Sequence, residues 1–339
     1  MSGSVPSPFY PLTPLLMYLI TGAAGFIASA LVAHLNAAGI EDLILADDFQ
    51  RYPAKEPNLA GKKYRLKIER DELFDRWDEE HWPLEGVYHL GARTDTAEPD
   101  KALFDRLNLN YSKEIWNRCT KWKTPLVYAS SGATYGLGEH GYKDDDQLAK
   151  ILEPLNEYGR SKNDFDRWVL DRLETPPNYY GLKFFNVYGP NENHKGRMAS
   201  VIWHTFNQVQ KTGAMKLFRS HNPDYADGHQ RRDFIYVKDL VAVNQWLMDN
   251  LPEPSGLYNL GTGQSRTFLD LATATFIAMG HEPAISFIDT PADIRDKYQY
   301  FTEAEMGKLR AAGYGEPFHT LEEGVEDYVK NHLLAGQTW

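Results

Sequence analysis

A glycine-bearing turn close to the N-terminus limits the possible folds most strongly. The segment Gly22 to Ala28 follows a short apolar run, Tyr18–Thr21, and opens a largely apolar stretch over Phe26–Ala38. Glycine lets the chain turn tightly at such a place, and it lets the backbone approach a pyrophosphate at the start of a helix. Any tight turn would also favour glycine, so the motif decides little without its context. Ala28 stands where a third glycine is commoner, and alanine is accepted there at some cost in close packing.

The first half of the chain alternates short apolar runs with longer amphipathic segments, which is typical of βαβ units around a parallel sheet. We expect strands at Tyr18–Thr21, Leu43–Asp47, Val87–Leu90, Leu126–Ser130, Gly181–Asn186 and Leu257–Leu260, and helices at Phe26–Ala38, Lys101–Trp122 and Tyr158–Leu173. The predicted fold class is therefore α/β, a Rossmann-type doubly wound parallel sheet with a smaller α/β lobe that binds the substrate.

The regular alternation stops after Asn186, where polar stretches with glycine and proline follow at Pro190–Gly196 and His221–Arg232. Such stretches are typical of loops that form a site. We predict that residues 17–186 and 233–260 form the dinucleotide-binding domain, and that residues 187–232 and 261–339 form the second lobe. Residues 1–16 resemble no element of this fold and are interpreted as an extension.

Charge and composition exclude several classes of protein. The net charge of −11 repels polyanions, and no run is rich in lysine and arginine, so we predict no nucleic-acid partner. The single cysteine, Cys119, forms neither an internal disulfide nor a Cys-based metal cluster, and no metal site is predicted. The apolar run Leu15–Ile20 is too short to span a membrane, and no signal-peptide pattern precedes it. We therefore expect a cytoplasmic enzyme without a membrane partner.

The end of the second predicted strand bears on the choice of dinucleotide. An acidic residue there, Asp47 or Asp48, is suited to the ribose hydroxyls of NAD, whereas a nearby cation accommodates the 2′-phosphate of NADP. Arg51, Lys55 and Arg70 are the available cations, and an ordinary solvated charge is the alternative for each. The predicted cofactor-binding residues are Gly22, Gly25, Phe26, Ile27, Asp47, Asp48, Arg51, Arg70, Leu90, Gly91, Ala92, Arg93, Asn108, Lys162 and Val187.

A tyrosine and a lysine four residues apart, Tyr158 and Lys162, are candidates for proton transfer. On a helix these positions share a face, so the ammonium is expected to stabilise the phenolate and to lower the pKa of the phenol. Ser131 ends a predicted strand at the edge where ligands collect, and its hydroxyl suits a substrate oxygen that gains charge. Taken singly, the pair occurs by chance as a packed tyrosine above a surface lysine, and Ser131 is equally a turn cap. Together with the glycine turn, they indicate nicotinamide redox chemistry on an alcohol.

Four motifs in order resemble the extended short-chain dehydrogenase/reductase family and its nucleotide-sugar members. They are TGAAGFIA, SSGATYG, YGRSK and FNVYGP, and the resemblance runs from Met17 to about Tyr328. Within the family, the epimerases that act on ADP-heptose are most similar. The residues that carry this closer resemblance are Asn191–Val201, Lys216–Phe218, Arg232–Phe234, Lys297–Gln299 and Phe301–Thr302.

The resemblance implies a second acid/base at Lys195 beside the catalytic set of Tyr158, Ser131 and Lys162. It also implies substrate contacts by Asn186, Arg197, His204, Phe218, Ser220, Arg232 and Tyr298. For Arg232 the side-chain chemistry supports this contact independently, because a planar guanidinium binds a diphosphate through paired hydrogen bonds. For Lys195 a solvated loop charge is the alternative, and a lone helical histidine such as His204 is more often a packed residue.

The activity implied is epimerisation at C6″ of ADP-D-glycero-D-manno-heptose, a step in making lipopolysaccharide core, through a 6-keto intermediate. The resemblance implies bound NADP, with NAD left open because no exact counterpart exists for a lysine of the second βα loop. It also implies a homo-oligomer, often a pentamer in the family. A UDP-sugar 4-epimerase, a dehydratase or a non-catalytic NADP-binding protein are the alternatives. A dehydratase normally needs an acidic pair beside the serine, and Gly132-Ala133 supply none; Gly132 itself stands where alanine is usual.

Overall fold

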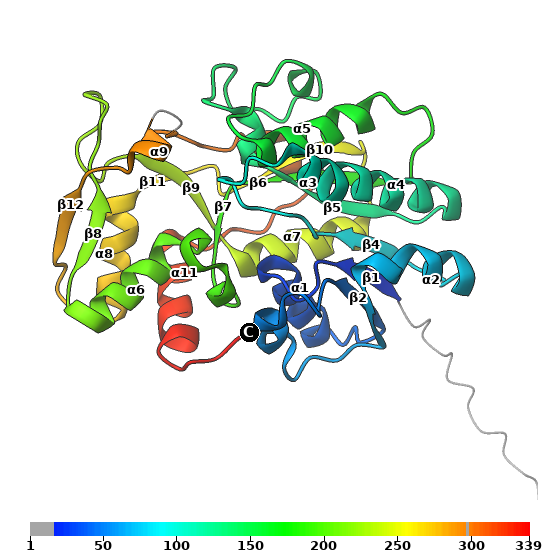
Figure 1. Cartoon of the computed structure of the whole chain (residues 1–339), viewed down its shortest axis with the longest axis horizontal. Coiled ribbons are helices and arrows are strands. Elements are labelled where there is room, and N and C mark those ends of the chain that lie inside the picture. The colour runs from blue at the N-terminus through cyan, green and yellow to red at the C-terminus, as the bar shows by residue number, and fades with distance from the viewer. Residues whose placement is uncertain (1–16, 296–297) are drawn as a thin grey trace, which may run out of the picture.

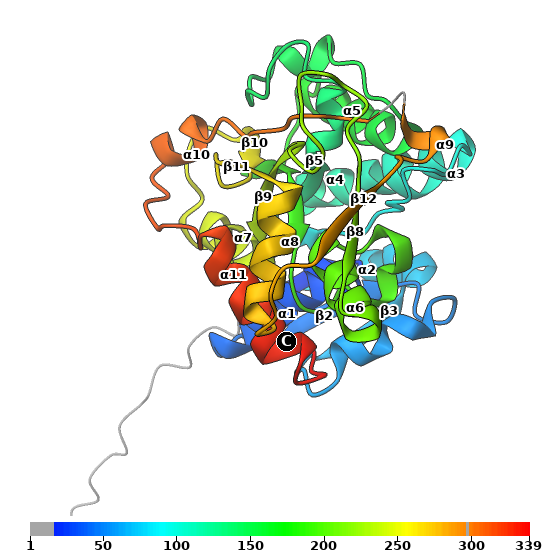
Figure 2. The same cartoon turned by 90° about the vertical axis from the view of Figure 1, so that its left-hand side faces the viewer.

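The computed structural model describes residues 17–295 and 298–339 of the chain. The predicted extension at residues 1–16 and Lys297 lie outside the described residues. Figures 1 and 2 show a large sheet flanked by helices and a smaller lobe beside it, which carries β8, β12, α6 and α8. No helix in the described part of the chain is long and apolar enough to cross a membrane.

The large sheet has seven strands, all parallel, in the order β10-β6-β5-β4-β1-β2-β3. Its strands are β1 (Tyr18–Thr21), β2 (Leu43–Asp47), β3 (Leu66–Glu69), β4 (Gly86–His89), β5 (Leu126–Ser131), β6 (Tyr179–Phe184) and β10 (Gly256–Leu260). The strand order reverses between β1 and β4, and ligands bind outside the carboxyl ends of the strands at such a switch point. The predicted doubly wound α/β fold is confirmed.

Helices cover both faces of this sheet. They are α1 (Phe26–Ala37), α2 (Leu73–Glu80), α3 (Lys101–Phe104), α4 (Tyr111–Trp122), α5 (Glu157–Leu170) and α7 (Val237–Asn250). Alternate residues of a strand pack into two separate cores, because successive side chains of a strand point to opposite faces of the sheet. Ile20 packs with residues of α1 and α7, whereas its neighbour Leu19 packs with Trp77 of α2 and Trp116 of α4.

The smaller lobe contains two small sheets and most of the remaining helices. The strands β7 (Asn186–Tyr188), β9 (Arg231–Tyr236) and β11 (Ser265–Thr267) form one sheet, and β8 (Met215–Phe218) pairs with β12 (Ile285–Ile288) in the other. The helices are α6 (Val201–Thr212), α8 (Phe268–Ala278), α9 (Ala292–Arg295) and α11 (Leu321–Asp327), whereas α10 (Gly307–Ala311) contacts β10 of the large sheet. Val209 of α6 and Phe276 of α8 pack against Leu217 of β8, so these elements share one core.

Three details differ from the sequence-based expectation. The strand β3 was not predicted, because it is an edge strand in which only Ile68 is buried. The predicted strand Gly181–Asn186 is divided, since β6 ends at Phe184 and Asn186 begins β7 in another sheet. The predicted helix Lys101–Trp122 contains a π-helical turn at Asp105–Asn110. The predicted boundary at residue 233 falls inside β9, and the division into domains stays a prediction.

Candidate active site

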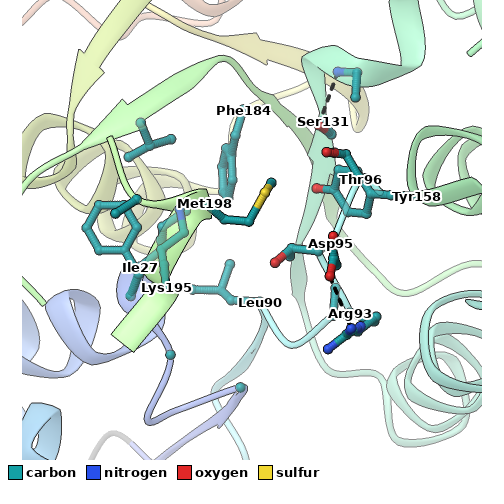
Figure 3. A pocket seen from close by; sticks show the side chains of 18 of the residues that line it. Ile27, Leu90, Arg93, Asp95, Thr96, Ser131, Tyr158, Phe184, Lys195 and Met198 are labelled. Atoms are coloured by element: carbon teal, nitrogen blue, oxygen red, sulfur yellow. Dashed lines mark hydrogen bonds and ion pairs between the residues drawn. The ribbon is translucent and has the colours of Figure 1, made fainter. Parts of the chain in front are cut away.

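One large cavity lies at the carboxyl ends of the central strands. Its volume is about 1200 Å³, and residues of both the large sheet and the smaller lobe line it. Figure 3 shows Tyr158 and Ser131 on one side of this cavity and Lys195 with Ile27 on the other. The predicted residues that line it are Gly22, Gly25, Phe26, Ile27, Asp47, Asp48, Arg70, Leu90, Gly91, Ala92, Arg93, Ser131, Tyr158, Asn186, Val187, Lys195, Arg232 and Tyr298.

The floor of the cavity is formed where the turns after β1 and β4 touch. A Cβ atom on Gly22 would lie 2.5 Å from the Cα atom of Gly91, and Gly22 has a φ of 67°. Both features require glycine at this position. Gly25 is the residue before α1, and the first turn of that helix carries Phe26 and Ile27 on the cavity wall. Exposed backbone N–H groups at a helix start favour an anion, so this floor suits a pyrophosphate.

The acidic end of β2 lies at one end of the cavity and faces two cations. Asp47 accepts a hydrogen bond from the backbone N–H of Ala24 (3.0 Å) and lies 3.4 Å from the ammonium of Lys55. Asp48 forms a 3.0 Å ion pair with Arg70. Lys55 and Arg70 both line the cavity, whereas Arg51 lies outside the lining with its guanidinium 5.5 Å from the Tyr52 ring centre. Of the predicted cations, Arg70 is therefore better placed than Arg51.

Ser131 and Tyr158 meet because β5 ends where α5 begins to pack on it. The backbone N–H of Ala133 donates a 3.1 Å hydrogen bond to the Ser131 hydroxyl, which holds that side chain at the cavity edge. Asn156 caps α5 by accepting from the backbone N–H of Gly159 (2.8 Å), and Tyr158 lies in the first turn of the helix. The two hydroxyl groups are thus presented to the same part of the cavity (Figure 3).

The expected lowering of the phenol pKa is not found. Burial raises the pKa of Tyr158, while the Ser131 hydroxyl acts to lower it and the carboxylate of Asp166 raises it further. Lys162 lies behind the cavity, and its ammonium donates a 2.8 Å hydrogen bond to the carbonyl of Ala129. Burial lowers the pKa of Lys162 to about 8, and Asp166 opposes that change. The prediction treated the two side chains as an isolated pair and left out both desolvation and Asp166.

A buried ion pair behind β5 was missed by the sequence analysis. Asp166 and Lys183 lie 2.7 Å apart, with 0% and 2% of their side chains exposed. Ser130 donates to Asp166 (2.6 Å), and Lys183 donates to Thr134 (2.8 Å). Asp166 lies one turn after Lys162 on α5, a spacing that was visible in the sequence. The network holds the β5 end that presents Ser131.

Lys195 enters the cavity from the loop between β7 and α6. Its ammonium lies 5.0 Å from the centre of the Phe26 ring, and burial lowers its pKa while Glu192 opposes the change. Glu192 is fully buried and accepts two 2.6 Å hydrogen bonds from Ser200, one from the backbone N–H and one from the hydroxyl. These two hydrogen bonds join Glu192, before Lys195, to Ser200, after it. A desolvated lysine loses its proton more readily, as a general base must.

Arg232 is a buried cation that lines the cavity from β9 of the smaller lobe, whereas the β2 carboxylates line it from the large sheet. It is 7% exposed, and its guanidinium donates to the carbonyls of Arg231 (2.9 Å) and Gln299. The Tyr298 ring lies 5.3 Å away. No carboxylate among the described side chains lies within ion-pair distance of Arg232. A buried cation that contacts only carbonyls and aromatic rings favours an incoming anion such as a diphosphate.

Seven predicted residues lie outside the cavity lining, namely Arg51, Asn108, Lys162, Arg197, His204, Phe218 and Ser220. Asn108 is buried behind it and accepts a 2.8 Å hydrogen bond from the backbone N–H of Arg93. Arg197 forms a 3.3 Å ion pair with Asp95, and its carbonyl lies 3.4 Å from the His204 ring. The Ser220 hydroxyl donates to the carbonyl of Asn222 (2.8 Å). The assigned roles of all these residues stay predictions.

Other lining residues were not assigned from the sequence. Asp95 and Thr96, in the segment after β4, lie near Tyr158 in Figure 3, and Met198 follows Lys195 on its loop. His194 also lines the cavity. Its pKa is lowered to about 4, mainly by burial and further by the positive charges of Lys55 and Lys195. The proximity of Asp95 and Thr96 to a strand end was the one signal that pointed to them.

The pattern of the NAD dependent epimerase/dehydratase family matches residues 18–261. The chain belongs to this family. It is 44% identical over 335 residues to the ADP-L-glycero-D-manno-heptose-6-epimerase of Fusobacterium nucleatum subsp. nucleatum, covering 95% of this chain and 100% of that one. It is 47% identical over 323 residues to the enzyme of the same name from Nitratidesulfovibrio vulgaris, covering 94% and 98%. The predicted relationship to nucleotide-sugar epimerases is confirmed.

The fold is also similar to a solved structure from this group. The structure of Helicobacter pylori ADP-L-glycero-D-manno-heptose-6-epimerase superposes with a TM-score of 0.76 at 25% sequence identity. The similarity covers 93% of this chain and 96% of that one. The similarity extends beyond residue 261, where the family pattern ends, and so includes the smaller lobe.

Proposed function

We propose that the protein inverts C6″ of ADP-D-glycero-D-manno-heptose to give the L-glycero epimer. The observation that carries the proposal is that Tyr158 and Lys195 line one cavity from opposite walls. Inversion with one fixed nicotinamide needs a proton acceptor in one orientation of the sugar side chain, where the alcohol is oxidised, and a proton donor in the other, where the keto group is reduced. The names of the most similar relatives support heptose as the substrate.

The two bases have different environments that fit these two roles. Tyr158 starts with a raised pKa, so it holds its proton at neutral pH and suits the step in which a keto oxygen is reduced. Lys195 has a lowered pKa and suits removal of the hydroxyl proton. The Ser131 hydroxyl lies beside Tyr158 to bond the reacting oxygen. A bound nicotinamide dinucleotide would accept hydride from C6″ and return it to the other face of the 6-keto intermediate.

The ends of the cavity fix the direction in which the substrate lies. The glycine floor at Gly22 and the carboxylates of β2 fit a dinucleotide, while Arg232 fits the diphosphate of an ADP-sugar. The reacting carbon then lies between them, near Tyr158. A guanidinium with no carboxylate partner among the described side chains gains its counter-charge from the substrate, which supports nucleotide-sugar binding.

NADP is the cofactor proposed here, although the family is described by NAD. Arg70 and Lys55 are cations at the ribose end of the cavity and suit a 2′-phosphate. In this structure Asp47 pairs with Lys55, and Asp48 pairs with Arg70. The two carboxylates would also suit the free ribose hydroxyls of NAD. The protein is further proposed to work in the cytoplasm as a homo-oligomer. Light scattering on the purified protein measures the oligomer directly.

Incubation with ADP-D-glycero-D-manno-heptose tests the proposal. Proton NMR should show the signals of the C6″ epimer growing to an equilibrium mixture without added cofactor, because a dinucleotide that regains its hydride in each cycle need not leave the protein. UDP-glucose serves as the comparison substrate and should remain unchanged. Conversion of UDP-glucose to UDP-galactose, with the ADP-heptose left intact, would instead show a sugar 4-epimerase.

A further inference from the structure

Two buried asparagines connect the dinucleotide turn with the loop that carries Lys195. Asn58 is 5% exposed and Asn191 is 1% exposed. The amide nitrogen of Asn58 lies 2.9 Å from the carbonyl of Ala24, in the glycine turn, and 3.0 Å from the carbonyl of Asn191. It also lies 3.2 Å from Nδ1 of His194. One side chain thus contacts both the turn after β1 and the start of the Lys195 loop.

Asn191 extends this connection to α1 and to the C-terminal segment. Its amide nitrogen lies 3.0 Å from the Ser29 hydroxyl on α1 and 3.2 Å from the main-chain oxygen of Trp339. Its amide oxygen accepts a 2.9 Å hydrogen bond from the backbone N–H of Trp339. Asn191 has a φ of 77°, which asparagine tolerates better than most residues. An amide that donates and accepts is therefore required in a left-handed position.

Trp339, which pairs with Asn191, contacts three other parts of the chain. The Trp339 ring packs against His34 of α1, with 6.2 Å between ring centres, and lies 5.1 Å from the ammonium of Lys238. Lys62 donates a hydrogen bond to the main-chain oxygen of Trp339. The C-terminal segment therefore lies against α1 beside the turn (Figure 1). The start of the Lys195 loop therefore lies between α1 and the C-terminal segment.

We infer that Asn58 and Asn191 are positioning residues that couple occupancy of the dinucleotide turn to the placement of Lys195. A pyrophosphate bound at the turn would fix the position of Ala24. Asn58, which donates to the carbonyls of both Ala24 and Asn191, would then fix the position of Asn191. Lys195 follows four residues later, and its backbone N–H donates to the carbonyl of Glu192 (2.9 Å), so a hydrogen-bonded turn connects it to the residue after Asn191. The catalytic consequence rests on the proposed role of Lys195. The coupling itself does not.

Hydrogen exchange tests the coupling without any sugar substrate. Binding of NADP, or of NAD in a parallel sample, should slow amide exchange in peptides covering residues 192–199 as well as those covering 22–28. Asn58→Ala should keep the protection of 22–28 and lose that of 192–199. Asn207→Ala, an exposed asparagine on α6, is the matched control and should behave as wild type. Equal protection of 192–199 in Asn58→Ala and wild type would overturn the inference.

A double-mutant cycle tests the action on Lys195. Asn191→Gly keeps the left-handed backbone but deletes the amide, so kcat should fall about 10- to 100-fold with little change in KM. In a Lys195→Met background the same change should have no further effect, because the group it positions is absent. Full additivity of the two losses, with both variants folded by circular dichroism, would show a purely structural role. An inactive wild type would refute the proposed function and leave the exchange experiment intact.

Discussion

Asp48 and Arg70 form an ion pair, 3.0 Å between oxygen and nitrogen, where the second strand of the large sheet ends. A 2′-phosphate must therefore compete with a carboxylate for its cation. Arg70→Ala should lower the affinity for NADP relative to NAD about 10-fold or more, as loss of a charged hydrogen bond does. Arg51→Ala, outside the cavity lining, should leave the ratio unchanged. Titration calorimetry with both dinucleotides measures it. An unchanged ratio in Arg70→Ala excludes this arginine as a phosphate ligand.

Arg232 should matter for the substrate and little for the cofactor. Arg232→Ala removes a cation that contacts only carbonyls and aromatic rings, so binding of the ADP-sugar should weaken by about 2–5 kcal/mol. Dinucleotide affinity should change little, because Arg232 lies on β9 of the smaller lobe and the glycine floor is formed by turns of the large sheet. Steady-state KM and dinucleotide titrations separate the two. Equal losses for both ligands indicate that Arg232 supports the fold.

Lys162 should reduce stability at neutral pH. Burial lowers its pKa to about 8 from an ordinary value of 10.5, so below pH 8 the folded protein holds a desolvated cation. Lys162→Met should therefore raise stability at pH 7 by up to about 3 kcal/mol. Between pH 8 and 10.5 the unfolded wild-type chain binds more protons at this site. The cost of Lys162 disappears there, and the advantage of the variant should shrink.

Urea unfolding of the wild type and Lys162→Met at pH 7 and pH 10 measures this difference. Comparing the two proteins at each pH removes the contribution of other titrating groups. A variant less stable than the wild type at both values would show that the hydrogen bond from Lys162 to Ala129 outweighs the desolvation of the ammonium.

Two glycines of the site should respond differently to alanine. Gly22→Ala places a Cβ atom 2.5 Å from the Cα atom of Gly91 at a φ of 67°, so the turn must distort and dinucleotide binding should be lost. A Cβ atom on Gly132 would come no closer than 3.4 Å to any neighbour, the carbonyl oxygen of Phe184. Gly132→Ala should therefore keep activity and stability. That result would show that glycine and alanine, the usual residue of the family here, are equivalent at this position. Retained cofactor affinity in Gly22→Ala contradicts the assigned turn.

The central sheet was predictable because its strands are buried on both faces and read as continuous apolar runs. The edge strand with Ile68 gave no such run and was missed. The sequence patterns also indicated Tyr158 and Ser131, and the family resemblance indicated Lys195. All three line the cavity, and their roles stay predictions. Asn58 and Asp166 were not found, because their importance comes from partners brought together by the fold. The raised pKa of Tyr158 depends on burial, which a local pattern does not reveal.

The roles of Tyr158 and Lys195 are tested most directly by single-base variants. Tyr158→Phe and Lys195→Met should each slow epimerisation by about 10²–10⁴-fold, and the double variant should be inactive. An ADP-sugar 6-aldehyde, which can disproportionate to alcohol and acid in one orientation, separates lost redox chemistry from lost inversion. The two-base account predicts that a single variant still disproportionates the aldehyde while it fails to invert C6″. A folded Lys195→Met protein that binds ADP-heptose and epimerises it at the wild-type rate would contradict it.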